Sequence, residues 1–185
     1  MLRGQIQRLP QQRVGMPLVR GPLQLWQDLD SYAEINLRED TMLFSHDGIH
    51  DSQTQLASPS YFYDQLRREI SLATRTEKPL ALIKILFDNP ESEQVRAYDI
   101  LHFSHELTQL TRQEDCIGRL GVNEVVIIVR DGHGNAELFV NRLLDAASLT
   151  VNHTLHIRIA TIFAQNNEDS IKLLDRLDRA ELITR

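Results

Sequence analysis

TRQEDCIGRLGVNEVVIIV, residues 111–129, is the stretch that decides the fold. Apolar residues stand on both sides of a short segment, Gly121 to Asn123, whose residue types suit a tight turn. We therefore predict a β-hairpin with strands over about 115–120 and 124–130. This hairpin places an antiparallel pair of strands within the second half of the chain.

The segments around the hairpin alternate between helical and strand periodicity. Apolar residues three or four apart indicate helices, whereas short apolar or alternating runs indicate strands. Ser58 or Ser60 is suited to cap the first helix, because a serine hydroxyl can accept a hydrogen bond from the free amides of a first turn. Besides the hairpin, the predicted helices span about 58–76, 95–111, 136–147 and 169–182, and the predicted strands about 80–87 and 155–163.

The predicted order is helix, strand, helix, strand, strand, helix, strand, helix. Such an order is typical of an α+β fold, in which a mainly antiparallel central sheet is flanked by helices. This domain would occupy residues 51–185. Residues 1–50 differ, because their first 22 residues contain four arginines, three prolines and no acidic residue. We predict an N-terminal arm there, followed by a helix around Trp26 that docks on the main domain or on a partner.

Composition narrows the class of protein. The 185 residues carry a net charge of -6 and a pI near 5.6, without the broad basic face that a nucleic-acid binder needs. No apolar run is long enough to span a membrane, so we expect no membrane insertion and a cytoplasmic location. Cys116, the single cysteine, has no partner for an internal disulfide. His46, Asp47 and His50 are candidate metal ligands, but a solvated polar loop is the more common meaning of such residues, and we expect no metal.

Several segments, in the same order, resemble the GGDEF family, the diguanylate cyclases. Arg112 and Asp115 form an R-x-x-D pair that is followed, after five residues, by a turn opening an apolar strand, which is the layout of the family signature. Residues 51–56 resemble the motif that opens the family's domain, and residues 78–82 resemble the start of its first strand. The resemblance covers about 51–185 and implies the family's nucleotidyl-cyclase-like fold.

The residues that the family uses for catalysis are mostly replaced. The resemblance implies an enzyme that condenses two GTP molecules with the help of two divalent cations, which carboxylate oxygens hold. Leu86 stands where the family's first strand carries a metal-binding Asp, and a leucine cannot ligate a cation. Ala97 stands where the family has an Asp that contacts guanine. We therefore predict a degenerate domain with no catalytic residue and no cyclase activity.

The glycine-rich turn of the signature is damaged in the same way. Gly121 and Glu124 match its first and fourth positions, while Val122, Asn123 and Val125 replace the second Gly, the acid and the Phe. In the family, the absent side chain of the second Gly lets the nucleotide approach the backbone closely. We interpret GVNEV as a degenerate active-site turn.

Arg112 and Asp115 resemble the family's inhibitory site, which binds the product cyclic di-GMP. An arginine fork can donate to guanine O6 and N7 or pair with a phosphate, and a carboxylate can accept from guanine N1 and N2. Arg142 stands about where the family adds a second Arg, and Arg119 would be a supporting cation, or otherwise a solvated strand residue. An R-x-x-D tetrapeptide is by itself more often a feature of a helix end, but its position here favours ligand binding.

The resemblance leads to two main functional hypotheses, with residual enzyme activity as a third. The first is a cyclic di-GMP receptor in a bacterial cytoplasm, which needs no cofactor and regulates a protein partner or a second copy, for instance in exopolysaccharide secretion and biofilm formation. The second is a scaffold that has lost nucleotide recognition and serves protein–protein contact or dimerisation.

Overall fold

The computed structural model describes residues 45–91, 95–130, 133–146, 149 and 155–184. The predicted N-terminal arm and the helix around Trp26 lie outside these described residues. In chain order the elements are α2 (Pro59–Thr76), β1 (Leu80–Asp88), α3 (Ala97–Leu110), β2 (Cys116–Gly121), β3 (Glu124–Arg130), α4 (His133–Asp145), β4 (His156–Phe163), α5 (Ser170–Asp178) and β5 (Ile183–Thr184).

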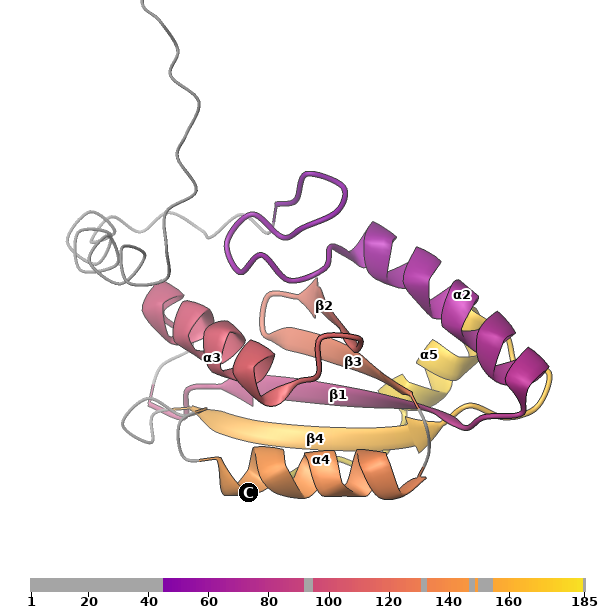
Figure 1. Cartoon of the computed structure of the whole chain (residues 1–185). Helices are drawn as coiled ribbons and strands as arrows, with labels where there is room; N and C mark the ends of the chain where they lie inside the picture. Colours follow the sequence, from indigo (N-terminus) through magenta and orange to yellow (C-terminus); the bar gives the residue numbers. More distant parts are fainter. Residues whose placement is uncertain (1–44, 92–94, 131–132, 147–148, 150–154, 185) are drawn as a thin grey trace, which may run out of the picture. The chain divides into compact units, whose positions relative to one another are not determined.

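The strands form one five-stranded sheet in the order β2-β3-β1-β4-β5. Figure 1 labels the neighbouring strands β2, β3, β1 and β4 of this sheet. Every neighbouring pair is antiparallel, and β1 lies at the centre, with Ile83 opposite Ile127 of β3 and Thr161 of β4. The predicted α+β fold with an antiparallel central sheet is therefore confirmed, as is the hairpin.

Helices cover both faces of the sheet. Residues alternate between the two faces along a strand, so Ile83 and Ile85 of β1 pack with α3 and α4, whereas Leu80 and Leu82 pack with α2 and α5. Fully buried side chains such as Phe103 of α3 each contribute roughly 1.5–3 kcal/mol of transfer free energy to this core. None of the helices in the described residues is long and apolar enough to cross a membrane.

Local sequence explains where the helices on the α2 and α5 face begin. The Ser58 hydroxyl accepts from the backbone amide of Tyr61 at 3.3 Å, and Pro59 occupies the first turn, where its missing N–H costs nothing. Asp169 caps α5 by accepting from the amides of Ile171 and Lys172 at 3.0 and 2.9 Å. The expectation that Ser58 or Ser60 caps the first helix is thus confirmed for Ser58.

The C-terminal segment differs from the prediction. The helix predicted to reach residue 182 ends at Asp178, and Ile183–Thr184 form β5 against Arg158 and Ile159 of β4. Pairing with β4 satisfies backbone groups at the sheet edge that a longer helix would leave open. The other predicted boundaries agree with the structure to within about three residues, the usual scatter at the ends of elements.

Close packing between β2 and α2 depends on one glycine. A Cβ atom built on Gly118 would lie 2.3 Å from Cδ2 of Phe62, a side chain with no exposed surface. Only a residue without a side chain lets the hairpin approach the helix at this point.

Candidate functional site

The corner between α3 and β2 holds the predicted Arg112 and Asp115 side by side. The Thr111 hydroxyl donates to the carbonyl of Leu107 at 2.7 Å and closes the end of α3. The amide of Asp115 then donates to the carbonyl of Arg112 at 3.1 Å, which forms a turn. As a result, Arg112 is exposed and Asp115 is half-buried at the same corner.

Helix α4 brings Arg142 to this corner. Its Nη2 donates to the carbonyl of Leu110 at 2.6 Å, and its guanidinium carbon lies 5.0 Å from the ring centroid of Phe139. Both contacts restrict the guanidinium, because one bonds an open carbonyl at the end of α3 and the other is a cation–π contact. Arg142 is therefore held in place beside the corner.

These side chains line one hollow of about 120 Å³. It combines two guanidinium groups and one carboxylate with an amide and apolar walls; its lining residues are Arg112, Asp115, Val129, Asn135, Leu138, Phe139 and Arg142. The volume is below that of a typical small-molecule pocket. A nucleotide bound here would contact the hollow with one side and remain partly outside it. The structure brings the three predicted residues together, and their role in ligand binding stays a prediction.

The carboxyl group of Asp115 is electrostatically perturbed. Burial raises its pKa above the ordinary value, and the nearby Glu114 adds to this. A hydrogen bond from the backbone amide of Arg130 and the charges of Arg112 and Arg130 act in the opposite direction without cancelling the rise. Asp115 therefore takes up a proton at a higher pH than an exposed aspartate.

Arg119 does not have the role predicted for it. Its side chain is only 2% exposed, and its Nη1 donates to Oδ1 of Asp51 and to Oε1 of Gln53, both at 2.8 Å. Its Nη2 and Nε donate to the carbonyls of Val122 and Gly121 at 3.0 and 3.3 Å. The prediction of a solvated residue or a ligand-supporting cation is wrong, because a buried carboxylate and the hairpin turn use the whole guanidinium.

The hairpin turn at Gly121 to Asn123 is tied to its surroundings through its backbone. Besides the two carbonyls that Arg119 engages, the carbonyl of Asn123 accepts from the amide of Phe87 at 3.1 Å. Val122 is exposed at the tip, whereas Val125 is buried in the core. The turn is thus fixed against β1 as well as against the loop at Asp51.

The carboxylates near this turn lie close to cations of the protein. Glu124 lies opposite Leu86 in the strand register; burial raises its pKa, and the charge of Lys84 opposes that rise. Asp88 accepts from Arg158 at 2.8 Å. Among the described residues, no group of three histidines, cysteines or acids is placed to hold a metal ion. Asp88 is therefore engaged by a cation of the protein, and Glu124 lies in the field of another.

Three other residues that the sequence singled out, Asp47, Ala97 and Cys116, have structural roles. Asp47 Oδ1 accepts from the amides of Ile49 and His50 at 2.8 and 2.6 Å, which makes the segment a tight polar turn. Ala97 is the first residue of α3. Burial raises the pKa of Cys116 to about 11, so its thiol stays protonated at neutral pH and is a poor nucleophile.

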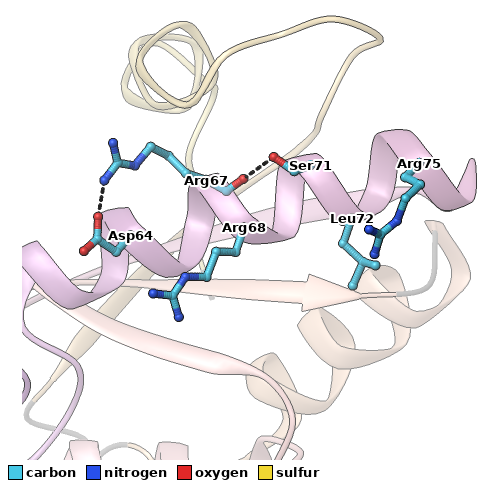
Figure 2. Close-up of a pocket in the computed structure, with 6 residues that line it drawn as sticks. All are labelled: Asp64, Arg67, Arg68, Ser71, Leu72 and Arg75. Atoms are coloured by element: carbon cyan, nitrogen blue, oxygen red, sulfur yellow. Dashed lines mark hydrogen bonds and ion pairs between the residues drawn. The ribbon is translucent and has the colours of Figure 1, made fainter.

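A larger hollow of about 550 Å³ lies along α2 (Figure 2). Arg67, Arg68 and Arg75 line it, but Figure 2 shows Arg67 turned toward Asp64 and Arg68 pointing to the opposite side. Cations that diverge in this way do not converge on one ligand group. The better candidate site is therefore the hollow at the corner between α3 and β2, which Arg112, Asp115 and Arg142 line.

Sequence reasoning missed the burial of two charged residues. Glu69 of α2 is 5% exposed and pairs with Arg130, and Lys84 of β1 is buried and donates to Asp178 at 3.0 Å. A signal existed for both. Glu69 falls on the apolar stripe of its helix, and Lys84 is a lone charge within an apolar run. Buried charges need partners, so a charge within an apolar stripe or run predicts an ion pair with another part of the chain.

Comparisons with known proteins identify the fold. No model of a known protein family matches the chain, and no curated protein matches it. Several solved structures, however, match the chain. A microbial GGDEF domain studied with cyclic di-GMP superposes with a TM-score of 0.61 at 20% identity, covering 70% of this chain and 85% of that one.

Two further structures agree. The GGDEF domain of DgcB from Caulobacter crescentus, in complex with cyclic di-GMP, gives a TM-score of 0.62 at 15% identity over 72% of this chain and 88% of that one. The diguanylate cyclase SiaD from Pseudomonas aeruginosa, in complex with its activator SiaC, gives a TM-score of 0.62 at 14% identity. This match covers 85% of this chain and 62% of that one. At such identities the likeness concerns the fold, and the described part of this chain has the fold of GGDEF domains.

Proposed function

We propose that this protein is a catalytically inactive GGDEF-fold domain that binds cyclic di-GMP through Arg112, Asp115 and Arg142 and thereby regulates a protein partner. The observation that carries the proposal is that these three side chains, from the α3–β2 corner and from α4, line one hollow. Structural neighbours that were studied with cyclic di-GMP support the choice of ligand.

The chemistry of the hollow suits a guanine with an attached phosphate. Two guanidinium groups offer paired donors for guanine O6 and N7 or for phosphate oxygens, and the Asp115 carboxylate accepts from guanine N1 and N2. Leu138, which is 70% exposed beside them, offers an apolar surface to a purine ring. Cyclic di-GMP has a second guanine, which would remain outside and be available to a partner or to a second copy.

Calorimetric titration with cyclic di-GMP tests the proposal. We expect the wild-type protein to release heat, and Arg112→Ala and Asp115→Asn each to weaken binding at least about tenfold, because each removes a charge-assisted hydrogen bond. Arg179→Ala, which removes an exposed arginine of the same charge from the end of α5, should bind like the wild type.

Two results would contradict the receptor proposal. One is a wild-type protein that gives no heat at saturating ligand; the nucleotide-independent scaffold would then be the better description. The other is an equal loss of affinity in Arg179→Ala and Arg112→Ala, which would indicate unspecific attraction of an anion.

The proposed lack of cyclase activity is a separate prediction. Incubation with GTP and Mg²⁺, followed by chromatography, should yield no cyclic di-GMP above background. Leu86 offers no oxygen to a cation, and the turn carries Val122 where close approach of a nucleotide needs a bare backbone. Product that accumulates with time, and that disappears in Glu124→Gln, would refute it.

A further inference from the structure

An ion pair links α2 to the end of β3, next to the candidate site. The Nε of Arg130 donates to Oε2 of Glu69 at 2.7 Å, and its Nη2 bonds the other carboxylate oxygen. Gln65 donates to Oε1 of Glu69 at 3.1 Å and fixes the carboxylate from its own helix. Two parallel bonds of this kind define the direction of the guanidinium as well as its distance.

Arg130 reaches the candidate site through its backbone. Cys116 lies opposite Ile128 in the hairpin, and Asp115 and Val129 line the same hollow, so the last residues of β3 run beside Asp115. The charge of Arg130 also favours the ionised form of the Asp115 carboxylate. In return, the hydrogen bonds of Glu69 and the charges of Asp115 and Glu114 raise the pKa of Arg130. Arg130 therefore lies between a buried acid of α2 and the acid that would accept from guanine.

We infer that Glu69 and Arg130 are positioning residues for the candidate site: their ion pair fixes the end of β3 and thereby holds the Asp115 carboxylate toward Arg112 and Arg142. The inference rests on the proposed function, and it makes α2 part of the control of ligand affinity.

The charges around Asp115 determine how this arrangement responds to pH. Cyclic di-GMP needs the ionised carboxylate as an acceptor, so affinity should fall as acid protonates Asp115. Loss of the Arg130 charge should make that protonation occur at a higher pH. The charged groups that face Asp115 are Arg112 and Glu114 from the corner, Arg130 from β3 and Arg142 from α4, with Glu69 of α2 acting through Arg130.

The test uses the full chain and a matched pair of double variants. Glu69→Gln/Arg130→Met removes the ion pair without leaving a buried charge unpaired. Glu168→Gln/Arg176→Met removes another pair with two hydrogen bonds, between the residue before the α5 cap and the last turn of α5. Its exposure is similar, 35% and 8% against 37% and 6%. Arg130→Lys keeps the charge and loses the fork.

Two measurements on these variants separate positioning from general damage. In calorimetry, we expect Glu69→Gln/Arg130→Met to bind cyclic di-GMP about three- to tenfold more weakly at neutral pH, and to lose affinity in acid at a higher pH than the wild type. Arg130→Lys should keep the wild-type pH profile. In NMR without ligand, the Asp115 carboxyl should titrate at a higher pH only in Glu69→Gln/Arg130→Met.

The outcomes distinguish the inference from the proposed function. If the wild-type protein binds, and both double variants share its affinity and pH profile, the positioning role is refuted while the receptor stands. If no protein binds but the Asp115 titration moves as expected, the receptor proposal fails and the electrostatic link from α2 stands. An unchanged Asp115 titration refutes the link in either case.

Discussion

Arg119→Met is expected to destabilise the domain by about 3–5 kcal/mol, the usual cost of removing one partner of a buried ion pair. Arg119 and Asp51 are both almost completely buried, with 2.8 Å between Nη1 and Oδ1. The methionine would leave the Asp51 carboxylate without its cation and the carbonyls of Gly121 and Val122 without a donor. Urea unfolding followed by circular dichroism measures the loss.

A surface pair provides the control for this variant. Arg158→Met also removes an arginine that is paired with an aspartate at 2.8 Å, but both side chains are more than one third exposed. Exposed pairs contribute about 0–1 kcal/mol. Equal destabilisation in Arg119→Met and Arg158→Met would show that burial of the Asp51 pair has no energetic consequence.

Because of the same ion pair, the free energy of unfolding of the domain should depend on pH in the acid range. Burial raises the pKa of Asp51, but hydrogen bonds from Thr54 and Arg119 outweigh it and lower the pKa below the ordinary value. A lowered folded-state pKa means that the contribution of Asp51 is present above the unfolded value and is lost as the pH falls through the folded one. The difference in stability between wild type and Asp51→Asn/Arg119→Met should therefore shrink in acid.

Gly118→Val is expected to cost about 3 kcal/mol or more, at the upper end of the range for overpacked cores. The new Cβ would lie 2.3 Å from Phe62 Cδ2, and Phe62 is enclosed between α2 and the sheet, so the ring has no free space to turn into. Either the hairpin or α2 must move. Thermal unfolding should show the loss as a lower Tm.

Gly134→Ala is the matched control, because nothing lies within 4 Å of a Cβ built on Gly134 of α4. Alanine in a helix is favoured over glycine by roughly 0.5–1 kcal/mol, so this variant should be neutral or slightly stabilised. A Gly118→Val protein as stable as the wild type would mean that the contact with Phe62 does not limit the approach of the hairpin.

Local pattern explains which parts of this structure the sequence could predict. The hairpin at Gly121 and the helices follow from periodicity, turn residues and caps, all of which act over a few neighbouring residues. β5 could not be predicted, because two residues become a strand only when β4 supplies an edge. The structure of residues 183–184 is therefore determined by their contact with β4.

The candidate site divides in the same way. The spacing of Arg112 and Asp115 places both at one corner, so their proximity could be predicted from the sequence. The burial of Arg119 could not, because its partner Asp51 lies 68 residues away in the chain. The link from Glu69 to Arg130 spans 61 residues and is also invisible to periodicity. Which charged side chains form these ion pairs becomes clear only in the folded structure.

The central place of β1 has a consequence for how the protein is made. β1 ends at Asp88, but its two neighbours are β3 and β4, and β4 ends at Phe163. A ribosome must therefore release nearly the whole domain before the middle strand is enclosed, and pairings between distant segments form slowly. Until then the nascent chain carries an apolar strand with open edges, which favours association between unfinished copies. Translation that stops after β3 should consequently yield insoluble fragments rather than a smaller folded protein.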